Sequence, residues 1–187
     1  MLHKINHIIS GCREGEARSQ EALYHHCYAA FIKICFRYAG GDADIAGSLF
    51  NSAMLKVFAK IGSFRNEGEV MGWIRKIVVN CCIDHCRLKT SFNTIDLTEG
   101  IEYTKPVVPE IYNRLSGNEV VALLFQLPKN TGFVFNLFVL EGYKHEEIAA
   151  LLGISVGTSK WHMNEARRLL KKKLQTLYPK ELISNAS

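Results

Sequence analysis

Side chains that can contact a nucleic acid are concentrated between residues 155 and 172. This segment combines hydroxyl, amide, aromatic and cationic groups at spacings that would place them on one side of a helix. Cations bind phosphates, whereas amide and hydroxyl groups can hydrogen-bond to base edges. The residues predicted to face base edges are Thr158, Trp161, Asn164 and Glu165, with Ser155 and Gly157 at the start of the same helix. The residues predicted to reach phosphates are Lys160, Arg167 and Arg168.

A second set of chemically competent residues consists of cysteines and histidines, in the runs 25–27 and 81–86. Cys82 and Cys86 lie four residues apart and could share a metal ion on one face of a helix. None of the six cysteines forms a CxxC pair, however, so a zinc or thioredoxin-like site is disfavoured. We expect buried thiols in a reducing compartment, with no metal and no other cofactor. A metal- or redox-controlled protein is an alternative.

Enzymatic chemistry is the class that the residues support least. The sequence has no recognisable nucleophile–base pair, phosphate-cradling loop or convergent set of carboxylates. It has no run of about 18–20 apolar residues that could cross a membrane, and its start lacks the apolar core of a signal peptide. We therefore expect a cytoplasmic protein that is neither an enzyme nor inserted in a membrane.

Charge is unevenly distributed along the chain, whose formal net charge is +5. Residues 90–113 contain four acids and one base, a net charge of −3, so the rest of the chain carries +8. Basic surface of this kind suits a polyanion, although charge alone favours an ordinary solvated surface.

The residues predicted to contact DNA require a pair of helices that presents them. Gly153 can adopt the positive φ that ends one helix, and Ser155 can cap the next helix through its hydroxyl. Ala149 is small where two crossing helices should approach closely. At the start of the first helix Lys144 replaces the usual Ser or Thr cap, although Glu147 can supply the other half of a capping box. The pattern over 144–173 therefore predicts a helix-turn-helix.

Two helical blocks flank an irregular segment. Pro106 and Pro109 fall within residues 91–113, which are rich in Ser, Thr, Asn, Gly and acids and have no helical period. Apolar spacing predicts helices over 18–38, 42–61, 73–89, 116–126, 128–140, 144–152 and 156–177, with a polar loop over 62–72. We predict an all-α protein with two small helical domains, 1–90 and 114–187, joined by an extended acidic linker, 91–113.

The helix predicted over 73–89 has two distinct faces. The residues predicted to point inward are Ile74, Ile77, Val78, Cys81 and His85. Lys76, Asn80 and Arg87 share another face, with Asp84 between the last two. That face offers cations for phosphates and an amide for a base edge.

Both blocks resemble bacterial sigma factors of the small extracytoplasmic-function (ECF) group, which have only a second and a fourth conserved region. The resemblance to the fourth region is carried by Leu127-Pro128, Glu141-Gly142-Tyr143, Glu146-Glu147-Ile148-Ala149, Leu152-Gly153-Ile154-Ser155, Gly157-Thr158, Lys160 and Ala166-Arg167. The resemblance to the second region is carried by Met54-Leu55-Lys56-Val57-Phe58, Phe64-Arg65, the run from Gly72 to Asn80, and Ile83-Asp84. The segment Ser159-Lys160-Trp161-His162 is similar to members from Bacteroidetes-like bacteria.

The resemblance implies an alternative sigma factor that binds core RNA polymerase and directs it to specific promoters. The first domain would read the minus-ten element and dock on the β′ coiled coil, and the last would read the minus-thirty-five element and dock on the β-flap. The acidic linker would occupy the channel that nascent RNA later takes. An anti-sigma factor is a further implied partner.

The same resemblance implies residue roles in the first domain. The implied minus-ten residues are Arg65, Asn66, Lys76, Asn80 and Arg87. The loop 64–71 would capture an extruded base, which costs a few kcal/mol and needs a close-fitting pocket. Asn51 and Lys56 are the implied polymerase contacts, although Gly47, Ser48, Asn51 and Ser52 replace acids and a Gln-Glu pair usual in the family. A helix-turn-helix regulator that does not bind polymerase is the alternative function.

Overall fold

The structure, a computed structural model, describes residues 2–65, 69–89 and 122–177. The chain divides into two compact units, residues 1–89 and 90–187. The segment predicted to be a linker, 91–113, lies outside the described residues, as do Asn66 and most of the helix predicted over 116–126.

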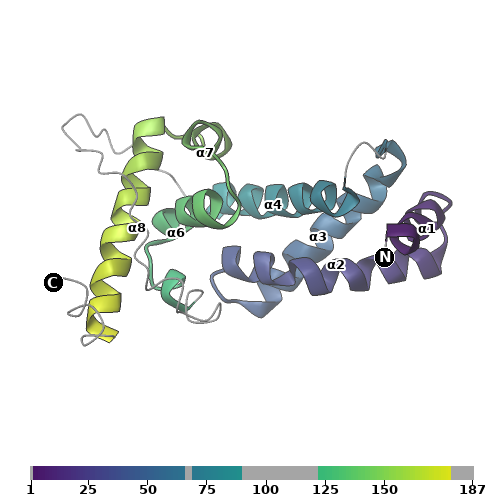
Figure 1. Ribbon diagram of the computed structural model, residues 1–187, viewed down its shortest axis with the longest axis horizontal. Coiled ribbons are helices and arrows are strands. Elements are labelled where there is room, and N and C mark those ends of the chain that lie inside the picture. Colours follow the sequence, from purple (N-terminus) through teal and green to yellow (C-terminus); the bar gives the residue numbers. More distant parts are fainter. Residues whose placement is uncertain (1, 66–68, 90–121, 178–187) are drawn as a thin grey trace. The chain divides into compact units, whose positions relative to one another are not determined.

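The described residues of unit 1 form four α-helices and one short 3-10 helix, whose arrangement is drawn in Figure 1. They are α1 (Leu2–Arg13), α2 (Ala17–Tyr38), α3 (Ala43–Lys60), η1 (Ile61–Ser63) and α4 (Val70–Lys89). Asp42 caps α3, since its Oδ1 accepts hydrogen bonds from the backbone N–H groups of Asp44 and Ile45 at 3.0 Å. Helices α2, α3 and α4 pack against one another around fully buried apolar side chains, including Leu23, Phe50, Met54, Ile74 and Val78.

The buried side of α4 differs from the predicted inward stripe. Ile74, Val78 and Cys81 are buried as predicted, but Ile77 and His85 are partly exposed. Val79, Cys82, Ile83 and Cys86 are buried instead. The prediction assumed one contact face, whereas α4 packs against both α2 and α3 and so buries a wider arc. The helix also begins at Val70, so the polar loop before it is shorter than predicted.

Helix α1 was not predicted, and its packing depends on Gly11. A Cβ atom on Gly11 would lie 2.2 Å from Ser19 Oγ and 2.3 Å from Glu16 Oε2 at the start of α2. The absence of a side chain therefore lets the two helices approach closely, and Ile9 and Cys12 of α1 are buried. Arg13, the last residue of α1, hydrogen-bonds to backbone carbonyls beyond the end of α3.

Unit 2 contains α6 (Lys129–Phe135), a π-helical turn η3 (Asn136–Leu140), α7 (His145–Leu152) and α8 (Val156–Leu177). Residues 122–124, at the start of the described part, are also helical. The segment predicted as one helix over 128–140 is thus continuous, but its last turn widens so that Glu141 N–H donates to Asn136 O at 3.0 Å. Helices α6 and α7 both pack against α8 (Figure 1). The unit's own apolar core includes Val134, Leu137, Ile148, Leu170 and Leu174.

The predicted all-α fold is confirmed, because the described residues form helices and contain no strand. None of the helices in the described ranges is both long and apolar enough to cross a membrane.

Candidate nucleic-acid interface

Helices α7 and α8 are joined by the turn that the sequence predicted. Gly153 ends α7 in the left-handed region, with φ 68° and ψ 37°, where an L side chain would be strained. Ser155 caps α8, since its Oγ accepts a hydrogen bond from Thr158 N–H at 2.9 Å. At the start of α7 Glu147 Oε2 accepts from Lys144 N–H at 2.7 Å, so half of a capping box is present. Local chemistry therefore fixes the angle at which α8 leaves α7.

Thr158 does not lie on the exposed face of α8, so the predicted outward position of its side chain was wrong. It is only 5% exposed, and its Oγ1 lies 2.9 Å from the Oγ of the capping Ser155. Because α8 packs against both α6 and α7, its buried arc is wider than the single stripe assumed from the sequence. The Thr158 hydroxyl is therefore buried and engaged at the helix cap, unlike the residues that remain accessible on α8.

The remaining predicted contact residues of α8 stay accessible to solvent. Ser155, Gly157 and Arg168 are exposed. Those partly exposed are Lys160, Trp161, Asn164, Glu165 and Arg167. These eight exposed and partly exposed residues are called the α8 outer face below. It combines three cations with an amide, a carboxylate and an aromatic ring, a composition suited to a DNA groove and its phosphates.

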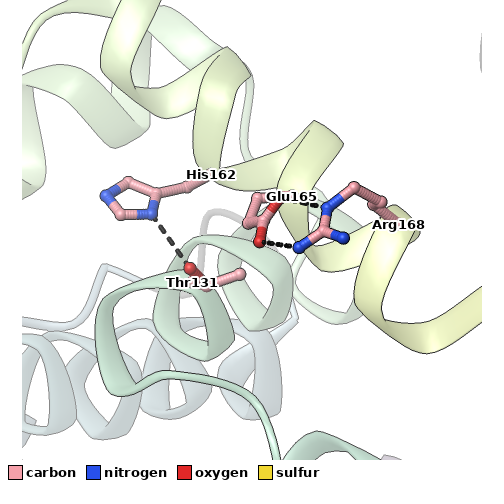
Figure 2. Close-up of polar contacts among 4 residues, drawn as sticks. All are labelled: Thr131, His162, Glu165 and Arg168. Carbon is pink, nitrogen blue, oxygen red and sulfur yellow. Dashed lines mark hydrogen bonds and ion pairs between the residues drawn. The ribbon is translucent and has the colours of Figure 1, made fainter. Parts of the chain in front are cut away.

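One ion pair on the α8 outer face joins Glu165 to Arg168 (Figure 2). Arg168 donates from Nε to Glu165 Oε2 and from Nη2 to Oε1, both at 2.7 Å. These hydrogen bonds lower the pKa of Glu165, which therefore stays ionised. The pair fixes the orientation of the planar Arg168 guanidinium, and the Glu165 carboxylate balances the positive charge of that group.

Two histidines with structural roles were missed by the sequence reasoning. His162 is buried in α8, and its Nδ1 lies 3.1 Å from Thr131 Oγ1 of α6 (Figure 2). The Trp161 ring meets the His162 ring edge-on, with centroids 4.9 Å apart. The signal that could have revealed His162 is its position next to Met163 on the inward side of α8.

The other missed histidine, His145, connects α7 to α8. Its Nδ1 lies 2.9 Å from Ser159 Oγ, and its ring stacks on Phe138 at a centroid distance of 4.4 Å. Burial and the positive charge of Lys160 lower its pKa, Glu146 raises it, and Arg167 adds to the lowering. The cations of α8 therefore create a positive electrostatic potential beside the first turn of α7.

On α4 the predicted outward residues Lys76, Asn80 and Arg87 are all exposed, as is Asp84. Asp84 Oδ2 lies 3.6 Å from Nζ of Lys56 on α3, and both side chains are about half exposed. An ion pair this exposed contributes little to stability. It does bring Lys56, an implied polymerase contact, to the helix that carries the implied minus-ten residues.

The two remaining predicted positions lie elsewhere in unit 1. Asn51 is exposed on α3, and its Oδ1 accepts a hydrogen bond from Tyr24 Oη at 2.7 Å. Arg65 is exposed in the segment after η1. The preceding Phe64 contacts Trp73 of α4, with ring centroids 5.2 Å apart.

The cysteines are free thiols, and all six are buried in unit 1. Burial raises the pKa of Cys27 and of Cys86 to about 12, so both stay protonated and poorly reactive at neutral pH. Cys82 and Cys35 approach to 4.0 Å between their Sγ atoms. Among the described residues no group of three or more His, Cys, Asp or Glu side chains is arranged to hold a metal ion.

Comparison with known proteins identifies both units. Residues 23–91 match the family Sigma-70 region 2, and residues 117–170 match Sigma-70, region 4. The ECF RNA polymerase sigma factor SigM of Mycobacterium tuberculosis is 31% identical over 133 residues, which are 71% of this chain and 64% of SigM. SigW of Bacillus subtilis is 26% identical over 156 residues, 78% of this chain and 83% of SigW.

A solved structure shares the fold: the sigma factor RpoE of Bartonella quintana, in complex with the anti-sigma factor NepR. The similarity covers 83% of this chain and 96% of that chain, with 21% identity and a TM-score of 0.50.

The two matched regions, in this order, define the class as sigma-70 factors. Within that class, the chain is similar to the ECF group, since curated relatives from several bacteria are ECF sigma factors. The similarity to Bacteroidetes-type members stays a prediction.

Proposed function

We propose that this chain is an alternative sigma factor that binds core RNA polymerase and directs it to specific promoters for transcription initiation. The observation that carries the proposal is the α8 outer face, held by a capped helix-turn-helix in a chain that also matches Sigma-70 region 2. The chain would act without catalysing a reaction, in the cytoplasm where promoter and polymerase meet.

The α8 outer face is proposed to read the minus-thirty-five element. In a helix-turn-helix, early residues of the second helix contact base edges and neighbouring cations contact phosphates. Trp161, Asn164 and Glu165 are therefore the proposed base contacts, while Lys160, Arg167 and Arg168 are the proposed phosphate contacts. Gly157 would allow close approach of the backbone, and Ser155 acts mainly as the cap.

The exposed side of α4 is proposed to read the minus-ten element. Lys76 and Arg87 would contact phosphates, and the amide of Asn80 would contact a base edge. Arg65 and Asn66 would hold an extruded base. Asn51 and Lys56 would meet the polymerase on its β′ coiled coil, and the second unit would meet the β-flap.

An anti-sigma factor is a further proposed partner. The Bartonella quintana protein of similar fold was solved with one. Binding of such a partner would compete with core polymerase if both cover the same surface of unit 1.

The proposal is tested by mixing the full chain with core RNA polymerase and a library of promoter fragments. We expect co-elution of a holoenzyme and transcripts that start only from promoters selected by the chain. Arg167→Ala should weaken binding of the chain to promoter DNA. Lys172→Ala, which removes an exposed charge beyond the proposed contacts, is its matched control. DNA binding without any holoenzyme would instead favour a helix-turn-helix regulator that never binds polymerase.

A further inference from the structure

In the described part of the segment between α3 and α4, local hydrogen bonds shape the first turn. After α3 ends at Lys60, residues 61–65, called the α3–α4 loop below, form one 3-10 turn and then extend. Within the loop, Ser63 Oγ donates to Lys60 O at 2.7 Å and Phe64 N–H donates to Ile61 O at 3.3 Å. At Phe64 the backbone is extended, with φ −69° and ψ 114°, so its carbonyl leaves the turn.

Arg13 of α1 forms hydrogen bonds with two backbone carbonyls of the α3–α4 loop. Its Nε donates to Ile61 O at 3.4 Å, and its Nη2 donates to Phe64 O. These carbonyls lie just beyond the C-terminal end of α3, where a positive charge is favoured. The planar guanidinium can bridge two acceptors in a fixed geometry, which a lysine ammonium cannot reproduce.

The arginine is itself well placed, because α1 is anchored to the rest of unit 1. Gly11 permits close contact with Ser19 and Glu16, and Ser19 Oγ donates to Glu16 Oε2 at 2.6 Å. Cys12, next to Arg13, is buried. On the other side of the loop, Phe64 packs against Trp73 in the first turns of α4. The loop is thus held between α1 and α4, with Arg65 immediately after the held carbonyl.

We propose that Arg13 is a positioning residue for promoter opening: its hydrogen bonds to the carbonyls of Ile61 and Phe64 fix the α3–α4 loop so that Arg65 is presented to minus-ten DNA. This inference rests on the proposed sigma-factor function and adds a residue that precedes both matched family regions, the first of which begins at residue 23. Capture of an unstacked base depends on a preformed pocket, since extrusion costs a few kcal/mol that only correctly placed contacts can offset.

The test compares Arg13→Ala, Arg13→Lys and Arg65→Ala with Arg18→Ala, which removes the same charge from an exposed position on α2. For the fluorescence measurement alone, which is made without DNA, a Trp161→Phe background leaves the emission of Trp73 to report on the loop, because the Phe64 ring contacts the Trp73 ring. We expect Arg13→Ala to increase quenching of Trp73 by acrylamide and to lower permanganate-detected opening by reconstituted holoenzyme about tenfold, as expected for lost charge-assisted hydrogen bonds.

Arg13→Lys should give an intermediate loss, and Arg18→Ala should match the unsubstituted chain. Binding of minus-thirty-five DNA should be unchanged in every variant. Normal opening by Arg13→Ala, or quenching of Trp73 that does not change, would overturn the inference. If Arg13→Ala fails to fold, normal opening by Arg13→Lys overturns it in the same way. Failure of the unsubstituted holoenzyme to open any promoter would instead reject the proposed function.

Discussion

At the scale of single residues, the α8 outer face divides into groups with different expected effects on DNA binding. Trp161 is partly exposed, and its ring lies in a T-shaped contact with the His162 ring, so it offers a flat apolar surface beside polar neighbours. Arg167 carries a charge, and its Nη1 lies 3.5 Å from Asn164 Oδ1, at the limit of a hydrogen bond. A rigid ring can discriminate among bases, whereas a cation attracts any phosphate.

We predict that Trp161→Ala changes which minus-thirty-five sequences are preferred, costing about 1–3 kcal/mol of discrimination at one position. Arg167→Ala should weaken binding to all sequences alike and reduce the slope of log K against log salt by about one. Fluorescence anisotropy with a panel of single-base variants at several salt concentrations separates the two effects. Equal weakening on every sequence by Trp161→Ala would contradict the assignment of Trp161 to base contact.

Residue-level prediction from sequence succeeded where the chemistry is local. The Ser155 cap and the positive φ of Gly153 follow from residue type and neighbouring positions alone. The burial of Thr158 could not be predicted in this way, because it depends on which elements cover the first turn of α8. The pairing of Glu165 with Arg168 has a signal in the sequence, because opposite charges three residues apart are neighbours on a helix.

At the scale of elements, the contact between α6 and α8 includes a buried histidine. Burial lowers the pKa of His162, whose Nδ1 is paired with Thr131 Oγ1. The unfolded chain therefore binds more protons than the folded chain at mildly acidic pH. The stability contributed by neutral His162 is present above the unfolded pKa of about 6.5 and is lost as pH falls through the lower folded pKa.

We predict that unit 2 unfolds at a lower temperature at pH 5.5 than at pH 7.5, and that His162→Gln reduces this difference. Trp161 emission in a Trp73→Phe background follows unit 2, and His26→Gln, an exposed position on α2, is the matched control. His145, whose pKa is also lowered, acts in the same direction, so some dependence should persist in His162→Gln. An unchanged pH dependence in that variant would show that His162 does not titrate with unfolding.

Most described helices were predictable from apolar spacing, and α8 has the predicted bounds. Helix α1 was not, because the feature that secures it is a contact of Gly11 with residues of the next helix. The π-helical turn at Asn136–Leu140 was also beyond prediction, since one extra residue per turn leaves no clear mark in the apolar spacing.

At the scale of the whole molecule, charge is divided between segments with different proposed partners. The four acids of residues 90–113, Asp96, Glu99, Glu102 and Glu110, interrupt a chain of net charge +5. A channel that accommodates RNA must attract negative charge, so an acidic segment is suited to occupy it. The same acids should weaken binding of the free chain to DNA by repulsion.

We predict opposite effects when these four acids are replaced by the corresponding amides. Affinity for core polymerase should fall, because attraction to a positively charged channel is lost. Affinity of the free chain for minus-thirty-five DNA should stay equal or rise, more so at low salt. Competition for core polymerase and anisotropy with DNA measure the two effects on one variant. A parallel fall in both affinities would indicate damage to folding and contradict the charge argument.

The confinement of all six cysteines to the interior of unit 1 has a practical consequence. A thiol introduced at an exposed position of α8, for example by Gln175→Cys, would be accessible to reagents, whereas the six natural thiols are buried. A maleimide dye could then be attached to the folded Gln175→Cys chain at a known position, without first replacing any natural cysteine. Energy transfer from that dye to labelled promoter DNA would time the arrival of the helix-turn-helix on its site.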